Sequence, residues 1–352
     1  MEQEVKIISS SPGLRLEDSL NEVFQMLNED LKTQNVIWAK VYLSDSSNQL
    51  NLLKSHPLFV DCFSKTAFSY IEQPLLNGSK IGILYCVTKC EIEVCIDGGK
   101  TIVKLPDRIY YFQSVRFDRS EVKTLTSEQQ TEKAFKKHIL MLQDYGLSLI
   151  DNCVRTWLYV RDIDVNYSGV VKGRNNIFEQ QGLTQKTHYI ASTGIEGYSA
   201  ESESLVSADF LSIQSKDMQQ KYLQALDYLN PTHEYGVAFE RGTSVCINDD
   251  VETFISGTAS IDKKGDCIFC GDVLQQAERL FLNIEKLLEG ADQSFNDLEY
   301  IIVYLRDLTD YHKINNYMQR RFSAIPFIVV KAAVCRPQWL IECECVARSK
   351  KN

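Results

Sequence analysis

The sequence lacks a long hydrophobic run, a basic leader and an excess of positive charge. No apolar stretch within its 352 residues approaches the roughly 20 residues of a membrane-spanning helix. The opening residues, MEQEVKIISS, have neither the basic start nor the apolar core of a signal peptide. The formal net charge of −9 argues against nucleic acid or an anionic membrane as the main partner, because both attract clustered positive charge. We therefore expect a cytoplasmic protein that binds neither nucleic acid nor membrane.

Zinc ligands are also scarce. The five histidines are scattered and form no HxH or HExxH motif. Cys267 and Cys270 form a CxxC, but no second pair stands at zinc-finger spacing. The 11 cysteines are odd in number, and a chain of this length does not need disulfides to stabilise its core. We expect reduced cysteines, no metal and no organic cofactor.

What the sequence does contain is a repeat. QQTEKAF at 129–135 is similar to QQAERLF at 275–281, and the two stretches are 275 − 129 = 146 residues apart. Downstream, WLYVRDID matches VYLRDLTD, with Tyr159 opposite Tyr304 at an offset of 304 − 159 = 145. Chance would rarely keep nearly one spacing for two motifs. The chain therefore contains a duplicated unit.

The second copy shows the element order β-β-α-β-α-β-β. Val273–Glu289 is predicted to be helical because its apolar residues recur every three to four positions, and Gly290 is a plausible end. The other expected elements are strands at 253–261, 267–271, 298–305, 327–334 and 340–347, and a helix at 310–322.

The first copy follows a similar order. Its expected elements are strands at 109–117, 154–160 and 188–193, and helices at 127–145 and 167–180. Each copy is typical of an α+β fold in which helices pack on one face of a mixed sheet. We expect an N-terminal half, 1–200, that includes a divergent unit at about 109–195, and a C-terminal domain, 201–352. Residues 1–108 show a helix at 17–31 and two strand-like runs, GILYCV and EIEVCI, but no clear place in the fold.

Several ordered motifs resemble known families. SGTASIDKKGDCIFCGDVLQQ, NIEKLLEGA, IVYLRDLTDY and WLIECECVA resemble the YjgF/RidA family of small trimeric proteins, which includes imine deaminases. VRTWLYV, THYIASTGIEG, YGVAFERGTS and CRPQWLIECE are similar to the chorismatases, which remove pyruvate from chorismate, and this resemblance covers about the whole chain. It implies duplicated YjgF-like units that bind chorismate, either as a homotrimer or as a pseudo-trimeric monomer.

The resemblance implies two catalytic residues. Glu342 matches the terminal-strand glutamate of both groups, and Cys335 stands seven positions before it, as in chorismatases that form 3-hydroxybenzoate (342 − 7 = 335). Glu342 would protonate the enol ether, and Cys335 would attack the ring or an epoxide-like intermediate. On a strand, Glu342 and Glu344 share one face, so their charges would raise one pKa. The alternatives are that both carboxylates face solvent and that Cys335 is buried packing.

A dianionic substrate such as chorismate requires arginine or tyrosine partners for its two carboxylates. The candidates near predicted strand ends and in the chorismatase-like segments are Arg155, Arg174, Tyr198, Tyr235, Arg241 and Ser256. The alternative for the arginines is a solvated surface position.

Two other functions remain open. An enamine or imine deaminase of the YjgF/RidA family would carry a carboxylate-binding arginine at the start of the last hairpin, where this chain has Ile325, Pro326 and Phe327. A non-catalytic small-molecule-binding protein of the same fold is the second alternative, because a fold does not imply an activity.

Overall fold

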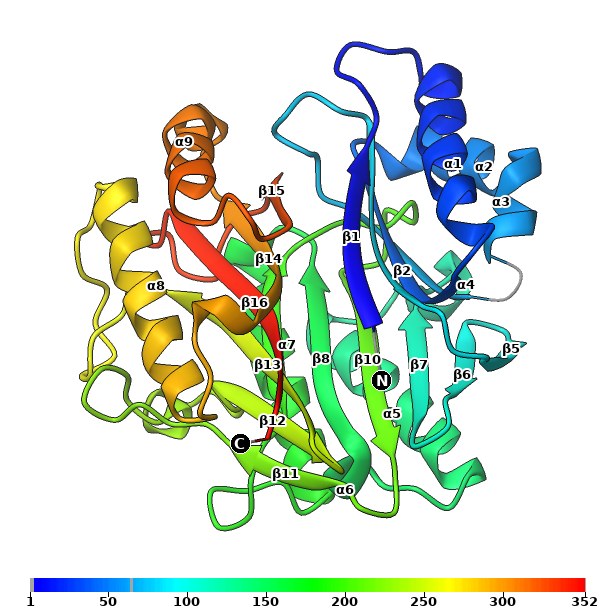
Figure 1. Ribbon diagram of the computed structural model, residues 1–352. Coiled ribbons are helices and arrows are strands. Elements are labelled where there is room, and N and C mark those ends of the chain that lie inside the picture. The colour runs from blue at the N-terminus through cyan, green and yellow to red at the C-terminus, as the bar shows by residue number, and fades with distance from the viewer. Residues whose placement is uncertain (1–2, 64–65, 352) are drawn as a thin grey trace.

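The computed structural model describes residues 3–63 and 66–351, which form three α+β units (Figure 1). The N-terminal unit spans 3–88, the middle unit 93–214 and the C-terminal unit 219–350. Each unit contains one sheet with helices beside it, so the expected α+β fold of repeated units is confirmed. No helix in these described ranges is long and apolar enough to cross a membrane.

The elements of each unit follow in chain order. The N-terminal unit contains β1 (Gln3–Ser9), α1 (Leu16–Leu31), β2 (Asn35–Leu43), α2 (Ser46–Ser55), α3 (Pro57–Phe63), β3 (Ala67–Glu72) and β4 (Ile81–Thr88). The middle unit contains β5 (Glu93–Asp97), β6 (Lys100–Lys104), β7 (Ile109–Val115), α4 (Arg119–Val122), α5 (Ser127–Asp144), α6 (Leu149–Asn152), β8 (Cys153–Val160), α7 (Ile163–Gln180), β9 (Ala191–Glu196) and β10 (Val206–Gln214). The C-terminal unit contains β11 (Gln219–Tyr222), η1 (Thr232–Tyr235), β12 (Gly242–Ile247), β13 (Asp250–Ala259), α8 (Val273–Glu289), η2 (Phe295–Asp297), β14 (Leu298–Leu305), η3 (Leu308–Asp310), α9 (Tyr311–Arg321), β15 (Phe327–Lys331) and β16 (Ile341–Lys350).

The three sheets share one strand order. It is β1-β4-β2-β3 in the N-terminal unit, β7-β10-β8-β9 in the middle unit and β13-β16-β14-β15 in the C-terminal unit. In each sheet the first three strands are antiparallel and the last pair is parallel. The middle and C-terminal sheets carry one further hairpin each, β5-β6 and β11-β12. Residues 1–108, which had no expected place, therefore contribute a third unit and the first hairpin of the second.

One glutamine of the repeated pair positions the second strand of the shared order, β10 or β16, in each of the two later units. Buried Gln130 on α5 accepts hydrogen bonds from the backbone N–H groups of Leu205 and Val206, at the start of β10. Its counterpart Gln276 on α8 is also buried and accepts from Leu340 N–H, just before β16. A buried amide requires such partners. The sequence repeat thus reflects a repeated helix-to-strand contact.

Two details differ from the sequence expectations. The predicted strand at 267–271 is wrong: Phe269 has φ +60° and Gly271 φ +82°, so the segment turns, and only an isolated bridge joins Ile261 to Cys267. We expected a domain boundary after residue 200. However, β10 begins at Val206 and pairs with β7 and β8, so it belongs to the middle sheet. The change of sheet therefore falls between Gln214 and Gln219.

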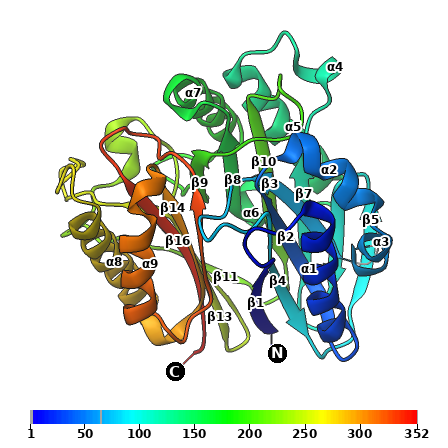
Figure 2. The ribbon, with the colours of Figure 1, turned by 90° about the horizontal axis from the view of Figure 1, so that it is seen from above.

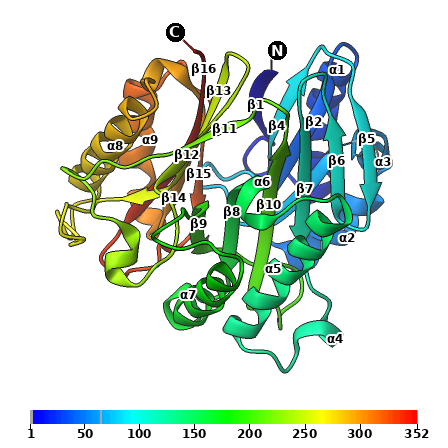
Figure 3. The same ribbon diagram turned by 90° about the horizontal axis from the view of Figure 1, so that it is seen from below.

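The helices lie outside and the three sheets face one another (Figure 2 and Figure 3). One apolar core contains side chains of all three units, including Tyr42, Tyr159 and Tyr304, each about 1% exposed. Single backbone bridges join neighbouring units, as between Leu75 and Val330 and between Ile195 and Val334. The center of the molecule is therefore a junction of the three sheets.

Candidate functional site

A cavity of about 700 Å³ lies between the middle and C-terminal units. The middle unit contributes side chains from α7 and β9, and the C-terminal unit contributes β13, β16 and the segments before β12 and β16. The lining residues with polar or reactive side chains are Tyr167, Arg174, Ser192, Arg241, Cys335, Arg336, Trp339 and Glu342.

Glu342 lies in the wall of this cavity. It belongs to β16, pairs with Ala259 on β13 and is only 5% exposed. Its carboxylate rests against Gly257, where an added Cβ would stand 2.3 Å from Oε1, so the glycine is needed for the close approach. Among the described residues, no side chain donates a hydrogen bond to this carboxylate.

The surroundings favour the protonated form of Glu342. Burial raises the pKa of Glu342 to about 8, and the charge of Glu344 adds to the rise, while Arg155 and Arg241 act in the opposite direction. The solvent-facing alternative for these two carboxylates is wrong, since Glu344 is 2% exposed. A buried carboxylic acid that keeps its proton near neutral pH can act as a general acid.

Only one unit carries an acid at this position. The strand registers place Tyr42, Tyr159 and Tyr304 at equivalent positions in the three sheets. The residues opposite them on the adjacent strands are Gly82, Ser207 and Glu342. The threefold repetition of the fold therefore does not extend to the acid.

Cys335 lines the same cavity and is half-buried. Burial raises the pKa of its thiol to about 12, the Glu342 carboxylate adds to the rise, and a hydrogen bond with Tyr167 opposes it. Cys335 is therefore a thiol at neutral pH, beside an acid that is also protonated. A reaction at its sulfur would require removal of the thiol proton.

Three arginines line this cavity. Arg174 on α7 and Arg241 before β12 are 1% and 6% exposed, and their guanidinium carbons lie 5.7 and 5.4 Å from the center of the Phe239 ring. Arg241 also donates to the carbonyl of Asn230 at 3.1 Å. Arg336 stacks on Trp339 at 4.7 Å. Guanidinium groups bind carboxylates with paired hydrogen bonds, so this cavity suits an anionic ligand.

Sequence reasoning found Arg174 and Arg241 but missed Arg336. Arg336 directly follows Cys335 in CRPQW, so its place next to a candidate catalytic residue was the available signal. Its part in the cavity wall becomes visible only when the segment before β16 folds over β13.

Arg155 and Ser256 do not line the cavity but hold its walls. Arg155 is 1% exposed and donates to Glu344 at 2.8 Å and to Thr193 at 2.5 Å. Ser256 Oγ accepts from Ser192 N–H at 2.9 Å and donates to the carbonyl of Glu240 at 2.6 Å. Both side chains therefore join the middle unit to the C-terminal unit.

Of the two predicted tyrosines, Tyr198 does not line the cavity, and the side chain of Tyr235 is not described. The Tyr198 hydroxyl group donates to Glu196 at 3.1 Å, its ring stacks on Arg161 at 4.8 Å, and its backbone bridges to Glu72 of the N-terminal unit. Tyr198 is therefore placed at a different junction. The side chain of Tyr235, at the end of η1, lies outside the described part of the chain.

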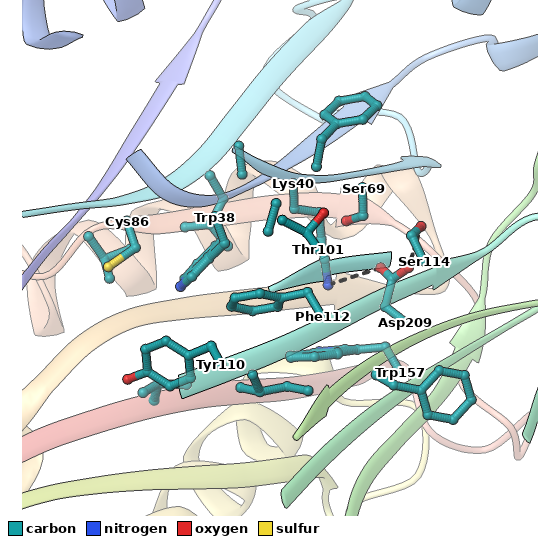
Figure 4. Close-up of a pocket in the computed structure, with 18 of the residues that line it drawn as sticks. Trp38, Lys40, Ser69, Cys86, Thr101, Tyr110, Phe112, Ser114, Trp157 and Asp209 are labelled. Carbon is teal, nitrogen blue, oxygen red and sulfur yellow. Dashed lines mark hydrogen bonds and ion pairs between the residues drawn. The ribbon is translucent and has the colours of Figure 1, made fainter. Parts of the chain in front are cut away.

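A second cavity, of about 800 Å³, lies where the three sheets meet (Figure 4). Figure 4 shows Lys40 directed at Asp209, with Phe112 and Trp157 nearby. Lys40 Nζ donates to Tyr159 at 2.6 Å and lies 3.8 Å from Asp209. At the other end, Arg348 forms ion pairs with Asp250, Glu252 and Glu299.

The charged groups of this central cavity pair with one another. The cavity is more apolar than the one at Glu342, and its cations form ion pairs with carboxylates. The interface cavity instead combines three arginines with a carboxylic acid that has no donor among the described residues. We therefore take the interface cavity as the candidate active site.

Comparison with solved structures places this architecture in a known class. A chorismatase structure has the same fold over the whole chain, with a TM-score of 0.70, 15% sequence identity and 98% of both chains covered. The molecule is thus a three-unit α+β protein of the chorismatase fold.

Sequence comparison identifies the family of the C-terminal unit. Residues 241–349 match the endoribonuclease L-PSP family. A RutC family protein from Pyrococcus abyssi is 34% identical over 96 residues, which cover 27% of this chain and 76% of that protein. The 3-aminoacrylate deaminase RutC of Acinetobacter baylyi is 28% identical over 96 residues, covering the same shares. The chain belongs to the RutC family.

Proposed function

We propose that the protein is a chorismatase that converts chorismate into pyruvate and a hydroxybenzoate, with 3-hydroxybenzoate as the favoured product. The observation that carries this proposal is the buried acid Glu342 in a cavity with three arginines, on a chain that has the chorismatase fold throughout. Arg174, Arg241 and Arg336 would bind the two carboxylates of the substrate.

Glu342 would supply the proton that starts the reaction. Protonation of the methylene carbon of the enolpyruvyl group makes the ether oxygen a leaving group. The oxygen of the neighbouring ring hydroxyl group would then bond to the ring carbon, while the bond from this carbon to the ether oxygen breaks with its electron pair on the ether oxygen. Pyruvate leaves, and the carboxylate left on Glu342 takes the hydroxyl proton, which gives an epoxide-like intermediate and restores the acid. The atoms of chorismate equal those of pyruvate plus hydroxybenzoate, so the overall reaction consumes no water.

Cys335 is the candidate nucleophile for aromatisation. The product assignment depends on it, because sulfur attack on an epoxide-like intermediate and later departure of the thiolate would leave the oxygen on the ring carbon that carried pyruvate. As the sulfur attacks, the thiol proton would pass to the oxygen of the opening epoxide. Departure of the sulfur would then be accompanied by loss of the ring proton, which restores the thiol.

The direct test is incubation of the purified protein with chorismate. Pyruvate is followed with a coupled dehydrogenase, and the aromatic product is identified by chromatography. We expect pyruvate and 3-hydroxybenzoate in equal amounts, and Cys335→Ala should still release pyruvate but form a different ring product. Cys95→Ala, at an exposed thiol on β5, is the matched control. A folded protein that releases no pyruvate would contradict the proposal.

The pH dependence gives a second test of the acid. Because the pKa of Glu342 is raised to about 8, kcat/KM for chorismate should be constant below that pH and fall about tenfold per pH unit above it. Cys335→Ala should keep this basic limb, since the proton comes from Glu342. A rate that stays constant up to about pH 10, with an unchanged circular dichroism spectrum, would exclude Glu342 as the proton donor.

An imine deaminase is the rival outcome. The relationship to a 3-aminoacrylate deaminase favours it, but Ile325–Phe327 stand where that activity would place an arginine, and Ile325 and Phe327 pack against the apolar core. Ammonia release from a reactive imine, without pyruvate release from chorismate, would favour this alternative.

A further inference from the structure

The CxxC pair lies beside the candidate active site. The sulfur atoms of Cys267 and Cys270 are 3.6 Å apart, because Phe269 and Gly271 turn the chain with positive φ angles. Cys270 is exposed and Cys267 is half-buried. A disulfide bond is about 2.0 Å long, so rotation of the two side chains could bring the sulfurs into bonding distance.

The loop that carries this pair supports one wall of the cavity. Arg336 Nη1 donates to the carbonyl of Gly265 at 3.1 Å. The sulfur of Cys267 lies 3.6 Å from the carbonyl of Gln338, and Gln276 Nε2 donates to that same carbonyl at 2.9 Å. Cys267 therefore contacts the segment that carries Arg336 and Trp339, which both line the cavity.

We propose that Cys267 and Cys270 are a reversible redox modification site, oxidised by a low-molecular-weight disulfide, whose oxidation displaces Arg336 and weakens anion binding in the interface cavity. The modification stands on the geometry of the pair alone. Its effect on chorismate rests on the proposed function.

The exposed thiol reacts first. Burial, and then the neighbouring Cys270, raise the pKa of Cys267, which leaves Cys270 as the accessible nucleophile. The Cys270 thiolate attacks glutathione disulfide and releases one reduced glutathione. Cys267 then loses its proton and attacks the Cys270 sulfur, which releases the second. Two electrons pass to the oxidant, and the two protons lost by the cysteines end on the released thiols.

The first experiment measures the modification itself. The full-length protein is equilibrated with glutathione disulfide, free thiols are alkylated, and peptides are analysed by mass spectrometry. We expect one disulfide between Cys267 and Cys270 that dithiothreitol reverses, a stable glutathione adduct on Cys270 in Cys267→Ser, and an unchanged pair in Cys95→Ser. If both thiols stay free under conditions that glutathionylate exposed Cys95, the proposal is overturned.

The second experiment measures the coupling to the cavity. Oxidation should raise KM for chorismate about tenfold, the effect of losing one charge-assisted hydrogen bond, with no such rise in Cys267→Ser. Tryptophan fluorescence should also change on oxidation, because Trp339 stacks on Arg336, and this readout needs no substrate. Disulfide formation with unchanged fluorescence would refute the coupling. A fluorescence change in a protein inactive on chorismate would count against the proposed function only.

Discussion

Replacement of Glu342 by glutamine should lower the rate of pyruvate release by about 10³-fold, because an amide cannot supply the proton that a general acid contributes. Glutamine has nearly the same shape and keeps the contact with Gly257, so the cavity should stay intact. Glu179→Gln, at an exposed position on α7, is the matched control and should leave the rate unchanged. Equal rates for the two variants would remove Glu342 from the mechanism.

The same substitution should stabilise the protein at alkaline pH. The folded-state pKa of Glu342 is about 8, above its ordinary value of 4.5, so the folded chain holds this proton more tightly. The resulting stability is fully present below pH 4.5 and is lost as the pH rises through about 8, where the buried carboxylate ionises. At about pH 9 we expect Glu342→Gln to raise the free energy of unfolding by about 2 kcal/mol, measured by urea denaturation. If the free energy of unfolding of Glu342→Gln relative to wild type does not change between about pH 6 and 9, the raised pKa of Glu342 is contradicted.

Replacement of Arg155 by leucine should cost about 3–5 kcal/mol of unfolding free energy, because it leaves the buried Glu344 carboxylate without its cation. Both side chains are about 2% exposed, and Trp157 donates a further hydrogen bond to Glu344 at 2.7 Å. The double variant Arg155→Leu with Glu344→Leu should recover most of the loss, since no charge is then buried alone. Urea denaturation of the four proteins of this cycle measures the coupling.

An exposed ion pair provides the control for this cycle. Lys32 and Glu29 on the surface of the N-terminal unit are 59% and 70% exposed, so Lys32→Ala should change the free energy of unfolding by less than about 1 kcal/mol. If Arg155→Leu costs no more than Lys32→Ala and instead raises KM alone, Arg155 binds substrate, as its position in the sequence first indicated.

Local patterns predicted much of the fold. The helix expected at 273–289 and the strand expected at 298–305 match α8 and β14, because apolar periodicity is a property of neighbouring residues. The third unit was missed because the N-terminal unit lacks the repeated QQxE motif. The motif that could have revealed this unit is VYLSD at 41–45, which resembles VYLRD at 303–307. In this alignment Tyr42 corresponds to Tyr304, and both residues lie in the apolar core.

The candidate site was predicted only in part. Glu342, Cys335, Arg174 and Arg241 meet in one cavity, whereas Arg155 and Ser256 support its walls and Tyr198 belongs to another junction. Strand ends show where polar residues cluster, but not which arginine already has a carboxylate partner. Arg155 donates a hydrogen bond to Glu344, which lies 189 positions away in the sequence, and no local pattern predicts such a contact.

The sequence by itself determined the repeated unit, the alternation of helices and strands, and the shared strand face of Glu342 and Glu344, because each depends on short-range spacing. Only the tertiary structure decided that the N-terminal segment forms a third unit and that the interface between the middle and C-terminal units holds the buried acid Glu342 among arginines. The reason is physical: Glu342 holds its proton because burial between two sheets removes water from its carboxylate, and that burial exists only when segments far apart in the chain have packed together.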